Sequence, residues 1–360
     1  MPSDHDGLPT AAQSASALSA ETAEATAARL LAIVRELLLE LRSSERSAAT
    51  LTLDSHVERD LALDSLARTE LLRRIEDTFQ APLGEQVLLA ETPRDLVTLI
   101  LQAHGRPLAA ASAGNEPLMQ PQASASGNPD RAQTLIEMLD WHIEVHPDRQ
   151  AILVYGSDEQ IETRFTYASL RQQAQAVAAG LQQRGLQPGQ TAAIMLPTSG
   201  DYFLAFFGIL LAGGVPVPIY PPVRPNQIEE HLRRHARLLG NAQTVALITV
   251  PEAKLVARLL QAQVEGLQHV VTVTELQQAT STWSETPVQS GDLAFLQYTS
   301  GSTGDPKGVM LTHANLLANL RAMGSRVEAR SEDVFVSWLP LYHDMGLIGA
   351  CLGSLYYAFP

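Results

Sequence analysis

The stretch "DLAFLQYTSGSTGDPKG", residues 292–308, decides the fold and raises the question of function. An apolar run with the composition of a strand leads directly into a loop of hydroxyl-bearing residues and glycines, namely Thr299, Ser300, Gly301, Ser302, Thr303 and Gly304. Glycines let backbone N–H groups approach a ligand closely, hydroxyls donate hydrogen bonds, and Lys307 adds a positive charge. A Walker A loop needs glycine directly before its lysine, but here Pro306 precedes Lys307. The stretch therefore predicts a polyphosphate-binding loop of another class.

Upstream of this loop, short β-rich runs alternate with helical ones. Strands are expected at 151–156, 191–196, 215–220, 245–250, 269–273 and 292–300. Helices are expected between them at 166–184, 202–212, 227–239 and 253–264. This alternation is typical of a largely parallel α/β sheet, and such sheets bind ligands beyond the carboxyl ends of their strands.

The N-terminal part differs from the α/β region in composition and in the spacing of its apolar residues. Residues 1–27 are rich in Ala, Ser and Thr, which predicts a disordered tail. Apolar residues then recur at helical spacing, at Leu30, Ile33, Val34, Leu37, Leu38 and Leu41. Further helices are predicted from Leu66 to Phe79 and from Thr92–Pro93 onward. The organisation expected is a small all-α bundle at 28–103, a flexible linker at 104–130, and an α/β domain at 131–360.

Composition limits the class of protein. The net charge of −14 argues against a general affinity for nucleic acid. A single cysteine, Cys351, excludes an internal disulfide and fits a reducing, cytoplasmic compartment. The uncharged segment 202–220 is interrupted by glycines and prolines from Gly213 onward, so it falls short of the ~20 helical residues that span a bilayer. No membrane span is predicted.

Within the bundle, the run "LALDSLARTELLRRIEDTF", residues 61–79, places Ser65 at the start of a helix. A phosphodiester there would meet unpaired N–H groups and the positive end of the helix dipole. Asp64 and Ser65 could instead be simple capping residues. The run and its flanking helices resemble an acyl carrier protein, although Ala62 stands where that family often has glycine. The resemblance implies that Ser65 carries 4′-phosphopantetheine, added by a phosphopantetheinyl transferase.

The loop at 299–307 resembles the AMP-binding signature of the adenylate-forming enzymes. Three further family motifs occur in order, as "FTYASL" (165–170), "LLAGGVPVPIYPP" (210–222) and "WLPLYHDMGLIG" (338–349). The resemblance implies an adenylation domain of the acyl-CoA synthetase-like type. It also implies that the 299–304 donors and Lys307 clamp the phosphates of ATP with Mg²⁺, and that His343 and Asp344 lie near the acyl and phosphate ends of the site.

Within that superfamily, residues 214–225 and 231–250 look most like the fatty acyl-AMP ligases, which pass a fatty acyl group from an acyl-adenylate to a carrier thiol. A downstream acyl-accepting enzyme or carrier is then the implied partner. Two alternatives stay open: an acyl-CoA synthetase or loading module for polyketide or peptide synthesis, and a non-enzymatic carrier tethered to an inactive nucleotide-binding remnant. The family's later motifs would follow Pro360, so the chain is expected to be truncated after the fourth motif, and inactivity of this fragment alone is left open.

One further pattern could hold a metal. His231 and His235 are four residues apart on a predicted helix, which could place two ligands on one face. Arginines 233, 234 and 237 surround them, and no third ligand is evident in the sequence. A solvated basic face is therefore favoured, and no protein-bound metal site is predicted.

Overall fold

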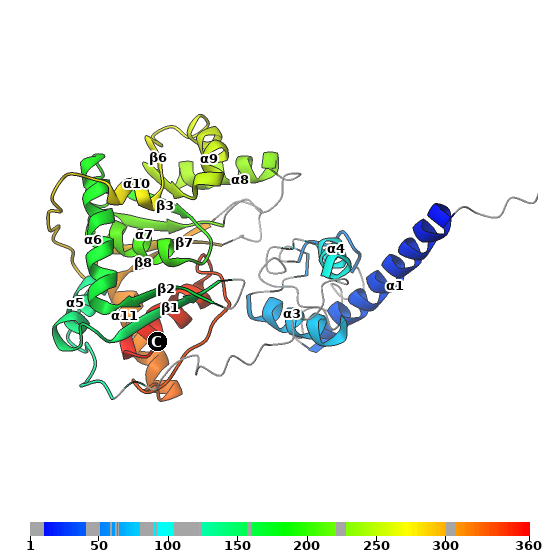
Figure 1. Cartoon of the computed structure of the whole chain (residues 1–360), viewed down its shortest axis with the longest axis horizontal. Helices are drawn as coiled ribbons and strands as arrows, with labels where there is room; N and C mark the ends of the chain where they lie inside the picture. Colours follow the sequence, from blue (N-terminus) through cyan, green and yellow to red (C-terminus); the bar gives the residue numbers. More distant parts are fainter. Residues whose placement is uncertain are drawn as a thin grey trace, which may run out of the picture. The chain divides into compact units, whose positions relative to one another are not determined.

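The structure is a computed structural model, drawn in Figure 1, and it divides into two compact units, Met1–Asn115 and Glu116–Pro360. It describes residues 11–40, 51–57, 60–61, 63, 65–79, 90, 92–103, 122, 124–156, 160–220, 228–299 and 307–360. None of the helices in these ranges is long and apolar enough to cross a membrane. The uncharged segment 202–220 is divided between a helix and a strand, as its glycines and prolines predict.

Unit 1 is the predicted helical bundle. Its described helices are α1 (Ala11–Glu40), α3 (Ser65–Phe79) and α4 (Pro93–Ala103). The predicted apolar stripe on α1 is buried against residues of α3 and α4, and the fully enclosed side chains include Leu30, Val34, Leu37, Leu38, Ile75 and Ile100. Leu41, the last residue of the predicted stripe, lies outside the described residues. Burial of these helix faces against one another stabilises the bundle, because short helices are marginal alone.

The structure describes part of each segment expected to flank the bundle. The segment expected to be a disordered tail, 1–27, is helical from Ala11 onward. It is rich in alanine, the best helix former, and has no glycine or proline between residues 11 and 27. The expected flexible linker, 104–130, is tied to unit 2 at its end, since Gln122 Nε2 donates to Gln150 O over 3.0 Å and Ala125 N donates to Ser331 Oγ over 2.9 Å.

A four-stranded parallel sheet in the order β4-β3-β5-β6 forms the centre of unit 2. Its strands are β3 (Thr191–Met195), β4 (Val215–Pro218), β5 (Ala246–Thr249) and β6 (His269–Val271). Two antiparallel pairs accompany it, β1 (Gln150–Tyr155) with β2 (Ile161–Thr166), and β7 (Leu293–Thr299) with β8 (Lys307–Thr312). All six predicted strands are therefore present, and sequence reasoning missed β2 and β8.

Helices cover both faces of the sheet, as the alternating pattern predicts. The helical elements of unit 2 are α5 (Leu135–Val145), α6 (Tyr167–Gln183), α7 (Gly200–Leu211), α8 (Ile228–Asn241), η3 (Pro251–Ala253), α9 (Lys254–Gln261), α10 (Val273–Gln277), α11 (His313–Val327), η4 (Met345–Leu352) and α12 (Gly353–Tyr357). Alternate residues of β3 face opposite cores: Ala192 and Ile194 pack with α6 and α7, and Ala193 and Met195 with α8 and α9. The result is a three-layer α/β/α arrangement.

Prolines explain why β7 does not extend this sheet. Val215 N donates to Gln190 O over 2.8 Å, and Ile219 N donates to Ile194 O over 2.9 Å, so these N–H groups of β4 face β3. The intervening residues, Pro216 and Pro218, have no N–H to offer on the other side. There β7 lies beside β4 but forms its ladder with β8. The last predicted strand therefore belongs to a hairpin and not to the parallel sheet.

The last residues of the chain pack back onto the start of unit 2. Tyr167 Oη donates to Leu355 O over 2.8 Å, and the His142 Nε2–H donates to Tyr356 O over 3.1 Å. Arg149 Nε donates to Ala358 O over 2.6 Å. These bonds fix α12 and the residue that ends it, which follow the motif at 338–349.

Candidate functional site

The predicted phosphate loop is held by the β7–β8 hairpin. Thr299 ends β7 and Lys307 begins β8, and the two residues are partners in the antiparallel register. Both side chains are exposed. Ser300, Gly301, Ser302, Thr303 and Gly304 lie outside the described residues. The two ends of the loop are thus fixed opposite each other, at the carboxyl end of β7 as the sequence predicts.

A close contact braces the base of this loop. Gly308 follows Lys307, and a Cβ added at Gly308 would stand 3.0 Å from Cζ of the Tyr298 ring. Tyr298 in turn donates its hydroxyl to Asn241 Oδ1 of α8 over 2.5 Å. Glycine at 308 therefore lets the Tyr298 ring lie across the hairpin next to the loop.

The motif at 338–349 is fixed by two side-chain donors from other elements. Tyr202 Oη of α7 donates to Leu341 O over 2.6 Å, and Gln297 Nε2 of β7 donates to Tyr342 O over 2.8 Å. Burial raises the pKa of Tyr202 well above its usual value, so its phenol stays protonated and remains a donor. Gln297 lies two residues before Thr299, so the motif is tied to the strand that carries the phosphate loop.

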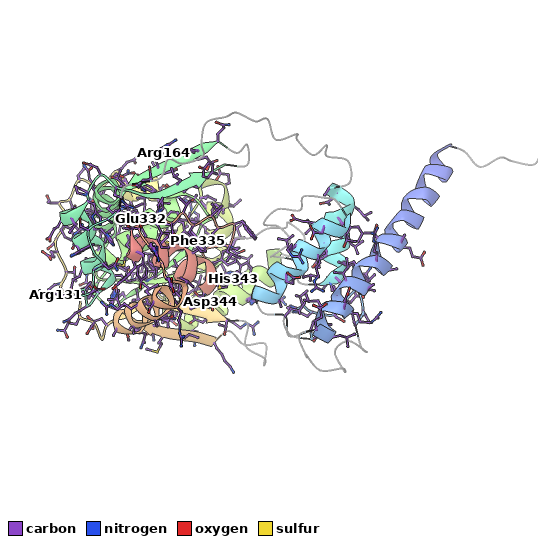
Figure 2. The ribbon with its side chains drawn as sticks, turned by 90° about the horizontal axis from the view of Figure 1, so that it is seen from below. Arg131, Arg164, Glu332, Phe335, His343 and Asp344 are labelled. Carbon is purple, nitrogen blue, oxygen red and sulfur yellow. The ribbon has the colours of Figure 1, made fainter. Side chains whose placement is uncertain are left out.

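His343 and Asp344 follow these two anchored carbonyls directly. His343 N donates to Pro340 O over 3.1 Å, which closes a turn, and Asp344 Oδ1 accepts from Met345 N over 2.8 Å, which caps η4. A Cβ at Gly346 would stand only 2.4 Å from Pro340 O, so the turn requires glycine there. Figure 2 marks the side chains of both residues at the start of η4. Both residues therefore lie in a turn that leads into a helix.

The structure brings together some of the predicted site residues. Thr299 and Lys307 are paired, and the His343 segment is bonded to Gln297 on the same strand as Thr299. Sequence reasoning missed Gln297 and Tyr202. A signal for Gln297 was present, because it is the polar residue within the buried run of β7. Tyr202 carried no signal, because it is simply the first residue of an apolar segment.

The surroundings of His235 differ from the solvated basic face that the sequence predicts. His235 is fully buried, and its ring lies edge-on to Tyr220 with the centroids 4.5 Å apart. The Arg234 guanidinium lies over the Tyr220 ring, 5.5 Å from the centroid of that ring. The expectation of a solvated face was therefore wrong for His235, and the His231 side chain lies outside the described part. Across the described residues, no group of three or more His, Cys, Asp or Glu could hold a metal ion.

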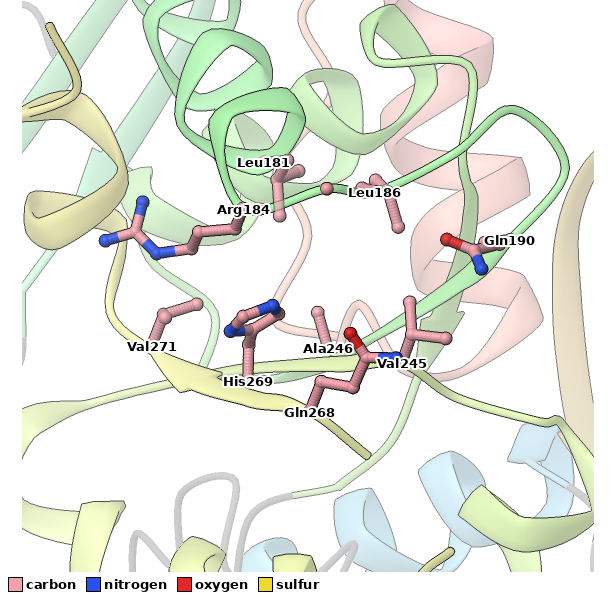
Figure 3. A pocket seen from close by; sticks show the side chains of 10 residues that line it. Leu181, Arg184, Leu186, Gln190, Val245, Ala246, Gln268, His269 and Val271 are labelled. Carbon is pink, nitrogen blue, oxygen red and sulfur yellow. The ribbon is translucent and has the colours of Figure 1, made fainter. Parts of the chain in front are cut away.

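Two cavities lie at the opposite edge of the sheet. Figure 3 shows the smaller one, about 40 Å³, where Arg184, Gln190 and His269 meet apolar side chains near the starts of β3, β5 and β6. It has room for only a few water molecules. A shallow hollow of about 320 Å³ lies near the starts of β4 and β7, beside Asp292 and His313. No predicted site residue lines either cavity, so neither is a candidate for the nucleotide site.

In unit 1, Ser65 is the first residue of α3, where the sequence predicted the start of a helix. Asp64 and the side chain of Ser65 lie outside the described part of the chain. The backbone places residue 65 at the positive end of a 15-residue helix, which is a favourable place for an attached phosphodiester.

The chain belongs to the AMP-binding enzyme family, whose pattern matches residues 139–359. The phosphopantetheine attachment site family matches residues 28–100. The fold class is thereby confirmed as a small all-α carrier bundle followed by an α/β adenylation domain of the acyl-CoA synthetase-like type.

Two curated relatives show which members of the AMP-binding family this chain is similar to. The long-chain-fatty-acid–AMP ligase FadD32 of Mycobacterium marinum is 35% identical over 197 residues, which are 54% of this chain and 31% of the relative. The medium-chain-fatty-acid–acyl-carrier-protein ligase JamA of Moorena producens is 29% identical over 231 residues, covering 63% of this chain and 39% of the relative. The chain thus spans about a third of the length of these curated relatives.

A solved structure agrees with these relatives. The crystal structure of a fatty acyl-adenylate ligase from L. pneumophila, in complex with acyl adenylate and pyrophosphate, matches with a TM-score of 0.58 and 32% identity. The match covers 66% of this chain and 40% of that one. The predicted resemblance to fatty acyl-AMP ligases is confirmed.

Proposed function

We propose that this protein activates a fatty acid with ATP as an acyl-adenylate and transfers the acyl group to a phosphopantetheine carrier thiol. One observation carries the proposal: the AMP-binding and the phosphopantetheine families match the same chain, at 139–359 and 28–100. An enzyme that makes acyl-adenylates gains a nearby acceptor from such a fusion, because tethering raises the effective concentration of the carrier.

The loop at 299–307 is the proposed phosphate clamp. In acyl-adenylate formation a carboxylate oxygen bonds to the α-phosphorus of ATP, and the bond to the pyrophosphate oxygen breaks. Negative charge then grows on the leaving phosphates, so fixed donors and a cation accelerate the step. Thr299, Ser300, Ser302 and Thr303 supply hydroxyls, Gly301 and Gly304 supply accessible amides, and Lys307 supplies the cation. The exposure of Lys307 and its pairing with Thr299 support this role.

The proposed role of His343 and Asp344 is to bound the other side of the reacting groups. His343 is half-buried, with its ring centroid 5.0 Å from that of Tyr342, and it would lie toward the acyl end. Asp344 is exposed and would lie toward the phosphate end. Because Tyr202 and Gln297 fix the two preceding carbonyls, the positions of both groups are set before substrate binds.

Mg²⁺ and phosphopantetheine are the implied bound groups. The described residues form no three-ligand cluster, which suits Mg²⁺ held mainly by ATP phosphates with one carboxylate such as Asp344. Bound Mg²⁺ would neutralise charge on the phosphate oxygens. Phosphopantetheine on Ser65 would supply the accepting thiol, and the start of α3 would stabilise its phosphodiester.

The partners of this protein follow from the same proposal. A phosphopantetheinyl transferase would load Ser65, and a downstream acyl-accepting enzyme or carrier would receive the acyl group. We place these reactions in the cytoplasm, in keeping with the single cysteine, Cys351, which is buried and unpaired.

The test uses the full native protein with its carrier loaded. It is incubated with ATP, Mg²⁺ and fatty acids of graded length, and acyl-AMP and the carrier mass are followed by mass spectrometry. We expect acyl-AMP to form and the mass of one acyl group to appear on the carrier. In the matched variant Ser65→Ala, acyl-AMP should still form while the carrier stays unmodified. In Lys307→Met, acyl-AMP formation should fall by about 10²- to 10³-fold.

Three outcomes would replace the proposal with an alternative. Equal turnover with free CoA would identify an acyl-CoA synthetase. A preference for amino or aryl acids would identify a loading module. Complete absence of adenylate from any acid, with Ser65 still loaded, would identify a carrier attached to an inactive nucleotide-binding remnant.

A further inference from the structure

We propose that Gln297 is a positioning residue, which fixes the His343–Asp344 segment relative to the phosphate loop through its bond to the Tyr342 carbonyl. The inference rests on the proposed function, since it names a residue that sets the geometry of the same site. Gln297 itself would touch neither the fatty acid nor the phosphates.

Of the two polar atoms in the Gln297 amide, the nitrogen has a hydrogen-bond partner among the described residues and the oxygen has none. The side chain is 6% exposed, and its Nε2 donates to Tyr342 O over 2.8 Å. Within the described ranges, Oε1 of the same amide has no hydrogen-bond partner. Turning the amide over would set two acceptor oxygens against each other, so the bond to Tyr342 O dictates the orientation.

Stability alone gives little reason for a glutamine at this place. The neighbours of Gln297 on β7 include Phe295 and Leu296, which are buried in the two cores of unit 2. An apolar residue would remove the acceptor Oε1, which has no partner, but it would also remove the donor to Tyr342 O, so glutamine gains the fold little stability over an apolar residue. The side chain therefore belongs to the class of buried polar groups that call for a functional reason.

The functional reason lies in the position of the carbonyl that Gln297 binds, Tyr342 O. Tyr342 O lies between Leu341 O, bonded to Tyr202 Oη, and the residues His343 and Asp344. Two successive carbonyls are thus anchored from two elements, α7 and β7. Gln297 is also two residues from Thr299, where the phosphate loop begins. The bond joins the His343 segment to the strand that ends at Thr299, and a shift of about 1 Å between reacting groups can lower a rate by about 10²-fold.

The decisive variant is Gln297→Met in the full native protein, since methionine has nearly the same length and volume. It removes the donor, and it also removes the buried acceptor Oε1. We expect kcat for acyl-AMP formation to fall by about ten- to a hundredfold, with KM for ATP changed less than about threefold. The midpoint of thermal unfolding should stay within about 3 °C of the wild type, because one unpaired carbonyl replaces another.

A matched control is available on α9. Gln261 Nε2 also donates to a backbone carbonyl over 2.8 Å, that of Gln268, but outside the site. Gln261→Met should leave kcat and KM unchanged. Loss of kcat in both variants would mean that any lost glutamine bond disturbs the fold, and it would overturn the inference.

A second readout needs no substrate. The three tryptophans of the chain are Trp141, Trp283 and Trp338, and only Trp338 lies in the motif at 338–349. With 5-fluorotryptophan incorporated, Gln297→Met should shift or broaden the ¹⁹F resonance of Trp338 and leave the other two unchanged. Gln261→Met should not move the Trp338 signal.

The two readouts separate failure of the inference from failure of the proposed function. If the wild type makes no adenylate but the Trp338 signal responds to Gln297→Met, the proposed function fails and the mechanical link stands. If the wild type is active and Gln297→Met leaves both kcat and the Trp338 signal unchanged, the inference is wrong. If Gln297→Met lowers the unfolding midpoint but leaves kcat per folded molecule normal, Gln297 contributes to stability only, and the inference is also wrong.

Discussion

At the scale of single residues, the two lysines of the chain have very different surroundings. Lys254 donates to Glu275 Oε1 over 2.6 Å, and the pKa of that carboxyl is lowered by this hydrogen bond. Lys307 is exposed at the start of β8, opposite Thr299. No other lysine occurs in this sequence. Labelling with an amine-reactive reagent can therefore monitor Lys307, with Lys254 as the one other lysine side chain to distinguish.

We expect ATP with Mg²⁺ to protect Lys307 from an amine-reactive reagent. Bound phosphates would pair with the ammonium group and shield it from the reagent, so the labelling rate at Lys307 should fall at least about fivefold. Labelling at Lys254 should be the same with and without nucleotide, which provides an internal control. Peptide mass spectrometry measures both sites in one sample. Equal labelling of Lys307 in both conditions would contradict the phosphate-clamp role.

At the scale of elements, close helix packing in unit 2 depends on particular glycines. A Cβ added at Gly180 of α6 would stand 2.2 Å from Leu276 O, a backbone atom of α10. At Gly240, near the end of α8, an added Cβ would meet nothing within 4 Å. Two glycines in helices of the same unit thus have opposite environments.

We expect Gly180→Ala to lower the free energy of unfolding of unit 2 by about 2 kcal/mol, because α6 and α10 must move apart. The control, Gly240→Ala, should raise stability by about 0.5–1 kcal/mol, because alanine favours the helix. Urea unfolding followed by tryptophan fluorescence measures both. Similar stabilities of the two variants would show that the α6–α10 contact adapts at little cost.

The same scale shows what sequence patterns can and cannot predict. Helix and strand positions in unit 2 followed from hydrophobic periodicity, because each segment is buried in a regular way. The pairing of β7 did not, since it depends on which N–H groups of β4 are missing at Pro216 and Pro218. Motif matches located Lys307, His343 and Asp344. Gln297 and Tyr202 escaped notice, because their role lies in long-range bonds to carbonyls at 341 and 342, which no local pattern encodes.

At the scale of the whole molecule, the chain has two units with separate cores. Among the described residues, the buried cluster of unit 1 draws its members from residues 30–100, and those of unit 2 draw theirs from residues 132–356. All tryptophans and tyrosines lie between residues 141 and 357, within unit 2. Aromatic fluorescence therefore reports on unit 2 alone, whereas far-ultraviolet circular dichroism reports on both units.

We expect Leu38→Ala to lower the free energy of unfolding of unit 1 by about 2–5 kcal/mol, because Leu38 is fully buried and its loss leaves a cavity. The adjacent Leu39 is 56% exposed, so Leu39→Ala should change stability by less than about 0.5 kcal/mol. In both variants the fluorescence transition of unit 2 should stay in place. A shift of that transition in Leu38→Ala would mean that the two units unfold as one.

Acid should destabilise unit 2 through its buried histidines. Burial, together with the nearby His146 and Arg149, lowers the pKa of His142 to about 3, and burial lowers the pKa of His313 to about 4 although Asp292 opposes this. Both rings stay neutral in the folded state and take up a proton in the unfolded state, where the pKa is near 6.5. Their contribution to stability is complete above pH 6.5 and is lost as the pH falls toward 4 and then 3.

The slope of unit 2 stability between pH 6.5 and pH 5 should therefore be positive, with at most about 1.4 kcal/mol per pH unit from each histidine. This window lies above the ordinary pKa values of Asp and Glu, about 3.9 and 4.3. His142→Gln should flatten the slope while His313 maintains part of it. Urea unfolding at closely spaced pH values measures it, and a wild-type stability that is flat over this window would contradict the prediction.

The bonds from Tyr202 and Gln297 end on main-chain oxygens, which every amino acid possesses. The anchored segment therefore tolerates sequence drift at position 342 without losing its attachment, whereas the donors at 202 and 297 admit few replacements. Substitutions at position 342, in evolution or in a laboratory library, can therefore change the side chain next to His343 while the two bonds from Tyr202 and Gln297 are kept. New substrate preferences are most readily sought at Tyr342, where the ring is half-buried and its carbonyl is retained in every variant.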